Sequence, residues 1–359
     1  MKVGIFSDVA ETPNTGPGNI IYNLAEHVTE RFSGEVVLLH TSDGSHEIYD
    51  GKDDIRISSN PVKSALQLRG EGFDIIHFDS VAKKESMVYP FLLDSALVAT
   101  QYGDVHFADP DIRMQDGLQL YKKQFGQRFA SRFLDRIMPL SESAKNNLVS
   151  GGIPERKLSV VNPGLDPLYE DMRDTVPLEE REPFLFHASQ LTVRKNPETL
   201  LKAYEMVIDD GYDLDLKIAG KDWSREVVTS TIDSPAADRV ELLGHISPEE
   251  VKEYYERCRL YLAPTRHEGF GLTAAEAMAC GTPVISHNVY AVPEVVGDAG
   301  VLVDDPEDAD AFADAVEQVL DDAELWNELS EKGRERAEQF SWENSAQQVI
   351  EIYDSVAAR

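Results

Sequence analysis

Short apolar runs alternate along the chain with longer stretches of helical periodicity. In the first half, the runs that fit buried strands are residues 3–6, 36–40, 75–78, 97–100, 136–140 and 158–161. In the second half, they are residues 184–188, 214–218, 240–243, 260–263, 284–286 and 301–303. This alternation is typical of βαβ units, in which helices cover both faces of a parallel sheet. The pattern therefore predicts an α/β fold made of two βαβ series.

The two βαβ series divide the chain into predicted domains. An acidic stretch punctuated by proline, residues 166–183, separates the series and fits a linker. We expect a first domain over residues 1–170 and a second over residues 171–340. An amphipathic helix follows within residues 341–359.

A loop and a short predicted helix in the second half carry the strongest candidate chemistry. Residues 267–283 read H-E-G-F-G-L-T-A-A-E-A-M-A-C-G-T-P. Gly269 and Gly271 free the backbone just before the helix, whose first N–H groups are unpaired and lie at the positive end of its dipole. This turn is therefore a natural seat for an anion, and two carboxylates, Glu268 and Glu276, flank it.

These residues resemble the E-x7-E motif of retaining glycosyltransferases of the large family-4 group, which have the GT-B architecture. The resemblance implies a nucleoside-diphosphate-sugar site in which Glu276 holds the ribose hydroxyls and Glu268 lies against the donor sugar. It places the diphosphate on the backbone and helix end formed by Gly269, Phe270, Gly271, Leu272 and Thr273. Two local interpretations stay open. Thr273 and Glu276 also fit a T-x-x-E capping box, and Glu268 also fits a solvated loop acid.

Two adjacent cations follow the first strand of the second half. The family usually has G-R-x4-K here, with both cations on the donor diphosphate. Lys195 matches the lysine, Gln190 stands where the arginine is expected, and Arg194 gives an R-K-N pattern also found in the group. The leaving diphosphate gains negative charge as the glycosidic bond breaks, so cations placed there stabilise the transition state. We therefore expect Arg194, Lys195 and Glu268 to be the catalytic residues.

The resemblance extends over nearly the whole chain. It implies two Rossmann-like domains facing across a cleft, with the last helix crossing back to the first domain. It also places the nucleotide base near His245 and Ile246, and the loop with Gly16 and Gly18 near the donor phosphate. A plain turn before a helix is the alternative for these two glycines.

The predicted strand at residues 97–100 is followed by a further candidate segment. Ligands bind at the carboxyl ends of strands in open sheets. Many family members have T-x-H-G or T-x-H-D here, and that histidine touches the donor sugar. This chain has Tyr102 at the histidine position, followed by Asp104 and His106. We expect these three residues on the acceptor or donor-sugar side, with ordinary loop residues as the alternative.

The overall charge excludes some classes of partner. Sixty-five acidic residues oppose 34 basic ones, which gives a net charge of −31. The acids are scattered, which favours adaptation of the whole surface to high salt, as in a halophile, over a local face for a basic partner. Nucleic acid is disfavoured as a partner because its phosphates would be repelled. Two cysteines without a pairing pattern and the lack of an 18-residue apolar run predict a cytoplasmic protein.

Residues 118–136 depart from the acidic composition. One acid, Asp135, stands among five bases: Lys122, Lys123, Arg128, Arg132 and Arg136. Apolar residues recur there at helical spacing: Leu118, Tyr121, Phe125, Phe129 and Phe133. This segment fits either a surface for an anionic acceptor or membrane, or a core-facing helix whose bases pair with nearby acids. The second interpretation is slightly favoured, because a core would use the aromatic rings.

Together these features predict a retaining, metal-independent glycosyltransferase, a hexosyltransferase, that uses a nucleoside-diphosphate sugar and no other cofactor. The acceptor would be a glycan, a glycolipid or a lipid-linked sugar, with a weak peripheral contact to the inner membrane face through residues 118–136. The D-x-D pairs at residues 109–111 and 213–215 are interpreted as chance pairs rather than metal sites. A sugar-nucleotide 2-epimerase or hydrolase of the same fold and a non-catalytic sugar-nucleotide binder stay open as alternatives.

Overall fold

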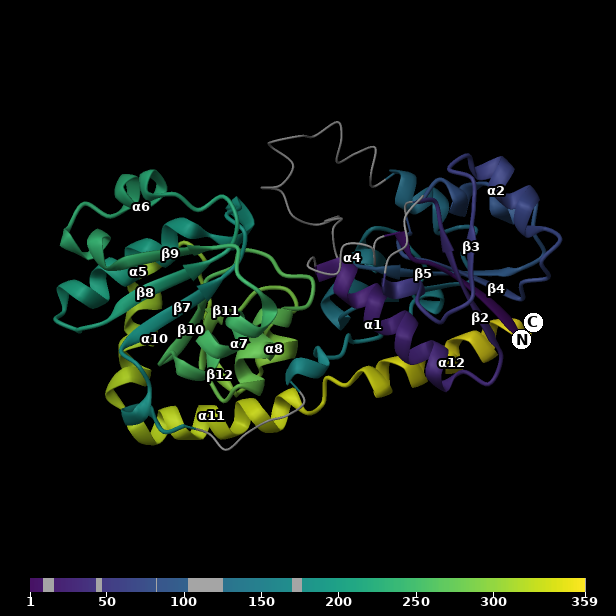
Figure 1. Ribbon diagram of the computed structural model, residues 1–359. Coiled ribbons are helices and arrows are strands. Elements are labelled where there is room, and N and C mark those ends of the chain that lie inside the picture. The colour runs from purple at the N-terminus through teal and green to yellow at the C-terminus, as the bar shows by residue number, and fades with distance from the viewer. Residues whose placement is uncertain (9–15, 43–46, 82, 103–124, 170–175, 359) are drawn as a thin grey trace. The chain divides into compact units, whose positions relative to one another are not determined.

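The chain forms two compact units. The computed structural model describes residues 1–8, 16–42, 47–81, 83–102, 125–169 and 176–358 (Figure 1). The first unit consists of Met1–Gly164 and Ser341–Arg359, and the second of Leu165–Phe340. The boundary therefore lies at Gly164, before the linker position expected from composition, and the last helix belongs to the first unit.

A parallel six-stranded sheet in the order β3-β2-β1-β4-β5-β6 is the centre of the first unit. Its strands are β1 (Lys2–Phe6), β2 (Glu35–His40), β3 (Asp54–Arg56), β4 (Ile75–Phe78), β5 (Ala96–Gln101) and β6 (Arg136–Pro139). Five of them match expected apolar runs. The run at 158–161 is not a strand and makes only a single bridge, between Ile137 and Leu158.

The sheet of the second unit is also parallel and has the order β12-β11-β10-β7-β8-β9. Its strands are β7 (Phe184–Ala188), β8 (Asp215–Ala219), β9 (Val240–Gly244), β10 (Leu260–Ala263), β11 (Val284–His287) and β12 (Gly300–Val303). All six coincide with expected runs to within one or two residues. Since neighbouring strands share one direction, their carboxyl ends lie along one edge of the sheet.

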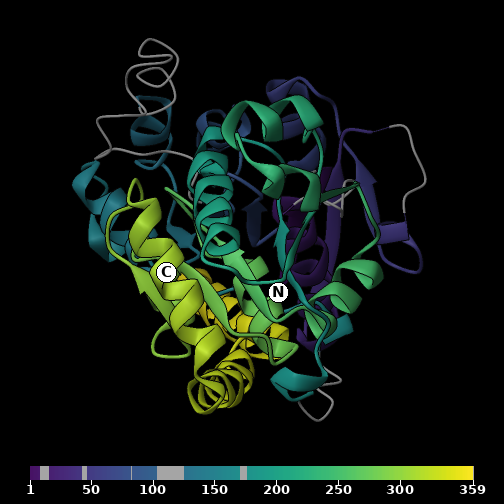
Figure 2. The same cartoon turned by 90° about the vertical axis from the view of Figure 1, so that its left-hand side faces the viewer.

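Helices cover both faces of each sheet (Figures 1 and 2). In the first unit these include α1 (Gly16–Arg31), α2 (Pro61–Leu68), α4 (Glu142–Ser150) and α12 (Trp342–Ala357). In the second unit they are α5 (Pro197–Asp209), α6 (Arg225–Thr231), α7 (Pro248–Arg257), α8 (Leu272–Ala279), α9 (Val292–Val296), α10 (Ala309–Asp321) and α11 (Ala323–Ala337). Among the residues that the structure describes, no helix is long and apolar enough to cross a bilayer.

The last helix is fixed to the first unit by buried contacts. Helix α12 packs against α1, and the side chain of Tyr353 is fully buried. The Tyr353 hydroxyl lies 2.7 Å from Nδ1 of His77 on β4, and Nε2 of His77 lies 2.9 Å from Thr100 Oγ1 on β5. Burial lowers the pKa of His77 to about 3, so the ring is neutral. A chain of side-chain hydrogen bonds therefore joins α12 to the sheet.

Both sheets have the strand order of doubly wound folds, in which the first strand of each unit is central. The chain winds outward on one side of this strand and then crosses to the other. The point of reversal lies between β1 and β4 in the first unit and between β7 and β10 in the second. Ligands of such sheets bind at the carboxyl ends of the strands at this point. In the second unit, the loops after β7 and β10 therefore form the candidate site.

Candidate functional site

The loop after β7 is held in place by the loop after β10. The carbonyl of Arg194 accepts hydrogen bonds from Arg266 N at 2.9 Å and from Thr265 Oγ1 at 3.1 Å. The Arg266 guanidinium also donates to the Val193 carbonyl at 3.0 Å and forms a bidentate ion pair with Glu307. These bonds fix the backbone from which the side chains of Arg194 and its neighbour project.

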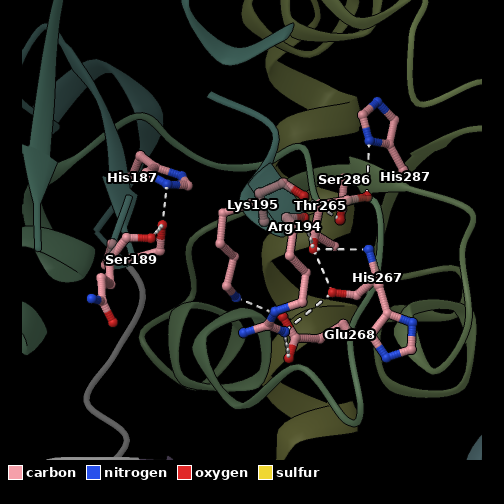
Figure 3. Close-up of polar contacts among 12 residues, drawn as sticks. His187, Ser189, Arg194, Lys195, Thr265, His267, Glu268, Ser286 and His287 are labelled. Carbon is pink, nitrogen blue, oxygen red and sulfur yellow. Dashed lines mark hydrogen bonds and ion pairs between the residues drawn. The ribbon is translucent and has the colours of Figure 1, made fainter. Parts of the chain in front are cut away.

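Three charged side chains meet between these loops (Figure 3). Lys195 Nζ lies 2.6 Å from Glu268 Oε2, and Arg194 Nη1 lies 3.1 Å from Glu268 Oε1. The side chains of Lys195 and Glu268 are each 16% exposed, and that of Arg194 is 45% exposed. Burial acts to raise the pKa of Glu268, but the charges of Lys195 and Arg194 outweigh it and lower the pKa to about 2. Glu268 is therefore a carboxylate with a cation on each oxygen.

Helix α8 begins directly beside this cluster. Its N-cap is Gly271, whose φ of +110° is in the left-handed region that favours glycine. The Gly271 carbonyl accepts from Ala274 N at 3.0 Å and from Ala275 N at 3.1 Å. The alternative of a capping box is wrong, because no side chain caps the helix and Thr273 lies inside it. The expected anion seat at the start of α8 is thus free of a local side-chain cap.

Glu276 lies on α8 and has an environment different from that of Glu268. The Tyr255 hydroxyl donates to Glu276 Oε2 at 3.5 Å. Burial, followed by the charge of Asp166, raises the pKa of Glu276 to about 7, although Tyr255 and Lys195 act in the opposite direction. The two glutamates of the motif therefore differ widely in acidity.

A small pocket opens at the point of reversal between β7 and β10. Lys195, Glu268, Gly271 and Thr273 contribute to its lining, together with His187 from β7. The Nδ1 atom of His187 donates to the Leu262 carbonyl at 2.7 Å, so Nε2 accepts from the Ser189 hydroxyl, also at 2.7 Å (Figure 3). Burial lowers the pKa of His187 to about 4, and the ring is neutral.

Sequence reasoning missed His187 as a site residue because it lies inside an apolar run. A polar residue near the carboxyl end of the first strand of the unit was the signal that could have identified it. Gln190, which stands where the family has arginine, donates to Asp222 Oδ2 at 2.7 Å. Gln190 is therefore engaged by the loop after β8, and Arg194 supplies the second cation of the cluster.

The remaining predicted residues occupy other loops. His245 and Ile246 lie between β9 and α7, at the same carboxyl edge of the second sheet. Helix α7 begins with a capping box, because Ser247 Oγ accepts from Glu250 N and Glu250 Oε2 accepts from Ser247 N. The D-x-D pair at residues 213–215 has a structural role, since Arg239 forms ion pairs with both Asp213 and Asp215.

In the first unit, Gly16 and Gly18 lie at the start of α1, and Tyr102 directly follows β5. Asp104 and His106 lie outside the described residues, as does the D-x-D pair at 109–111. Within the described ranges, no three His, Cys, Asp or Glu side chains are grouped as metal ligands.

The second unit matches a known protein family. Residues 169–336 fit the family described as glycosyl transferases group 1. This part of the chain is similar to group 1 glycosyltransferases. Its match confirms the resemblance drawn from the E-x7-E stretch.

Curated relatives of this part of the chain include bacterial enzymes. O-antigen chain mannosyltransferase B of Escherichia coli is 36% identical over 174 residues, which cover 47% of this chain and 45% of the relative. D-inositol 3-phosphate glycosyltransferase of Rhodococcus opacus is 29% identical over 248 residues, which cover 64% of this chain and 55% of the relative. The chain thus spans about half the length of the curated relatives it matches.

Solved structures share the fold over the whole chain. Sucrose-phosphate synthase from Thermosynechococcus elongatus has a TM-score of 0.82 and 20% identity, and the match covers 100% of this chain and 99% of that one. HepE of Anabaena in complex with UDP has a TM-score of 0.79 and 17% identity, with 99% and 100% coverage. These likenesses confirm the expected GT-B fold of two parallel α/β units.

Proposed function

We propose that this chain is a retaining, metal-independent glycosyltransferase that moves a sugar, most simply a hexose, from a nucleoside-diphosphate sugar to a glycan, a glycolipid or a lipid-linked acceptor. The observation that carries the proposal is the meeting of Arg194, Lys195, Glu268 and the start of α8 at the point of reversal of the second sheet. The names of the relatives support it: one is a mannosyltransferase, and HepE was solved with UDP and with UDP-glucose.

The two cations act on the leaving group. As the bond between the sugar and the diphosphate breaks, negative charge accumulates on the diphosphate oxygens. Arg194 and Lys195 place two positive charges in position beforehand, and the first N–H groups of α8, at Leu272 and Thr273, add donors and the positive end of the helix dipole. In this proposal these groups perform the charge neutralisation for which other enzymes use a divalent metal ion.

The two glutamates have different roles in the proposal. Glu268 is ionised by its two cation partners, so it accepts hydrogen bonds from hydroxyls of the donor sugar and positions the sugar rather than acting as a nucleophile. Glu276 holds the ribose hydroxyls, and the loop with His245 and Ile246 receives the base. In the first unit, Gly16, Gly18, Tyr102, Asp104 and His106 stay predicted donor or acceptor contacts. The cytoplasmic location and the adaptation to high salt also stay predictions.

Turnover of nucleotide sugars tests the reaction. The full chain is incubated with UDP-, GDP- and ADP-hexoses, with and without a glycan or lipid extract as acceptor, and with EDTA. The proposal expects acceptor-dependent release of one nucleoside diphosphate, no loss of rate in EDTA, and a product anomer, assigned by NMR coupling constants, that matches the donor. A 2-epimer formed without acceptor, an inverted anomer, or activity restored only by Mg²⁺ after EDTA contradicts it.

Measuring nucleotide binding together with turnover distinguishes a non-catalytic nucleotide site from an enzyme with slow turnover. A nucleotide that binds only the folded state stabilises it by RT ln(1 + [L]/Kd), about 2.7 kcal/mol at a hundredfold excess over Kd. We expect UDP, GDP or ADP at millimolar concentration to raise the melting temperature in molar KCl. Binding without turnover of any sugar nucleotide would instead support the non-catalytic binder.

A further inference from the structure

The segment at residues 125–134 places its phenylalanines at the surface, with Phe125 exposed and Phe129 and Phe133 half-buried. Residues 125–130 are helical, and a turn follows. Its core-facing side chains are at most 2% exposed: Gln127, Ala130, Ser131 and Leu134. Gln127 Nε2 donates to Gln101 Oε1 at the end of β5 at 2.6 Å. The core-facing side of this segment is therefore filled by these four residues, and the phenylalanines lie at its edge and surface.

Four phenylalanine rings form a continuous row on the outer side. Phe91, at the end of a short 3-10 helix (Tyr89–Phe91), contacts Phe133 with ring centroids 5.3 Å apart. Phe133 contacts Phe129 at 5.2 Å, and Phe129 contacts Phe125 at 6.4 Å. The two ends of the row are strongly exposed, Phe91 at 69% and Phe125 at 61%. A contiguous exposed apolar patch on a folded chain marks an interaction surface.

Positive charge lies alongside the row. Arg128 and Arg132 alternate with the phenylalanines in the sequence. After the helical residues 125–130, Lys157 Nζ donates hydrogen bonds to the carbonyls of Ser131, Arg132 and Leu134. Arg132 and Arg156 are exposed. Neither forms an ion pair with any acid in the described part of the chain. The expected pairing of the bases of residues 118–136 with nearby acids is thus absent for Arg132.

We propose that the surface formed by Phe91, Phe125, Phe129, Phe133, Arg132 and Arg156, the aromatic-basic surface, docks the first unit onto an anionic lipid bilayer. Phenylalanine rings flanked by exposed arginines are the side chains that enter the boundary between lipid headgroups and acyl chains, where the arginines bind lipid phosphates. Each cation close to an anionic leaflet strengthens binding about fivefold.

Charge complementarity decides between a membrane and other partners. The chain carries a net charge of −31, so an anionic bilayer repels it as a whole, and the exposed arginines beside apolar rings give this surface a local charge of the opposite sign. A second copy of this chain would bring its own negative charge to the contact. Membrane docking is separate from the proposed glycosyl transfer, and vesicle binding can be measured without substrate. The docking proposal can therefore fail or hold whatever the outcome for the proposed function.

Vesicle sedimentation tests the docking. The full chain is mixed at about 0.15 M KCl, where the Debye length is about 8 Å, with phosphatidylcholine vesicles or with vesicles that also contain phosphatidylglycerol. We expect binding to the anionic vesicles at least about tenfold stronger than to neutral ones. Arg132→Glu/Arg156→Glu and Phe91→Ser/Phe125→Ser should each weaken that binding by about tenfold or more. Arg69→Glu and Leu66→Ser, which change exposed residues at the end of α2 and on α2 in the same unit, should leave it unchanged.

A second readout covers variants that fail to fold. Phe125→Trp keeps a large aromatic ring, and the emission of the added tryptophan should shift to the blue only with anionic vesicles. Equal binding to neutral and anionic vesicles, or wild-type binding by the folded double variants, would overturn the proposal. So would an unshifted tryptophan emission in Phe125→Trp, or a dimer in sedimentation equilibrium that Phe91→Ser/Phe125→Ser dissociates, because a second copy would then cover the surface.

Discussion

Lys195 Nζ lies 2.6 Å from Glu268 Oε2, although the two residues are 73 positions apart and belong to different loops. Both side chains are largely buried, and Arg194 occupies the other carboxylate oxygen. The carboxylate thereby holds two cations in place beside the start of α8. A diphosphate that binds there meets cations whose positions are already set, which is the condition for stabilising charge in a transition state.

Removing the Lys195 ammonium should therefore affect the chemical step. We expect Lys195→Ala to lower kcat roughly 10²-fold, the usual effect of losing one preorganised group that stabilises transition-state charge. Steady-state kinetics with the identified donor measure it. Lys202→Ala is the matched control, because Lys202 on α5 is 46% exposed and pairs with Glu198 one turn away. Equal kcat values for the two variants would show that Lys195 does not contact the leaving group.

The raised pKa of Glu276 predicts a pH-dependent stability. Its pKa rises from 4.5 to about 7 in the folded state. The folded state therefore holds this proton more tightly than the unfolded state does. The stabilisation is fully present below pH 4.5 and is lost as the pH rises through about 7, on the order of 3 kcal/mol at most. Glu276→Gln carries no such proton, so it should be more stable than the wild type above pH 8 and lose this advantage at pH 5.

Chemical unfolding at several pH values measures this difference, and subtracting wild-type from variant values cancels the other titrating groups. Asp166→Asn is the companion variant, because the Asp166 charge is the second cause of the raised pKa. It should shift the same pH dependence downward while leaving the carboxyl in place. A difference between Glu276→Gln and wild type that is constant from pH 5 to 8.5 would refute the assignment.

Much of the fold follows from the apolar runs, and the exceptions have physical reasons. Strand β3 is missed because it is three residues, Asp54–Arg56, with charged ends, and it exists through its pairing with β2 at the sheet edge. The run at 158–161 is apolar, yet it does not extend the sheet beyond one bridge to β6. Pairing partners, rather than local composition, decide these edge elements.

The candidate site was predictable to the level of which loops meet. The family resemblance placed Lys195 and Glu268 on the same donor, and the doubly wound strand order brings the ends of β7 and β10 together. The individual bonds were not predictable, because they depend on side-chain geometry. Gln190 turns to Asp222, and the capping role considered for Thr273 disappears because α8 begins after Gly271. The position of the phenylalanine row at the surface was also not predictable. It follows from the tertiary contact that turns Gln127, rather than a phenylalanine, toward Gln101.

The left-handed backbone of Gly271 predicts a local effect on nucleotide binding. An alanine Cβ at this position would meet only Glu268 Cγ at 3.6 Å, so strain at φ +110° dominates, about 1–3 kcal/mol. We expect Gly271→Ala to shift the start of α8 and weaken nucleotide binding, measured by calorimetry. Gly211→Ala has the same kind of strain at φ +100° in open space after α5, and it should reduce stability without changing the nucleotide Kd. Equal nucleotide Kd values for the two variants would show that the start of α8 does not contribute to nucleotide binding.

Arg181 predicts a large effect on the stability of the second unit. Its side chain is 4% exposed, and its guanidinium donates to carbonyls near the ends of two helices. The acceptors are the carbonyls of Val176, Tyr255, Cys258, Cys280 and Gly281 and the hydroxyl of Thr282. Tyr255 and Cys258 are at the end of α7, and Cys280 and Gly281 follow α8, so one cation satisfies the negative ends of both helices.

Arg181→Met keeps an apolar chain in place but removes the guanidinium donors from these carbonyls, of which those of Tyr255 and Gly281 keep hydroxyl donors from Thr282 and Ser330. Because each unsatisfied buried acceptor costs about 1–3 kcal/mol, we expect the variant to lose at least about 3 kcal/mol of unfolding free energy. Urea unfolding followed by tryptophan fluorescence reports it, since the guanidinium lies 5.0 Å from the ring of Trp326. Arg257→Met, which removes an exposed ion pair to Glu182, should lose less than about 1 kcal/mol. Similar losses in both variants would mean that water replaces the guanidinium, and that the ends of α7 and α8 do not depend on Arg181.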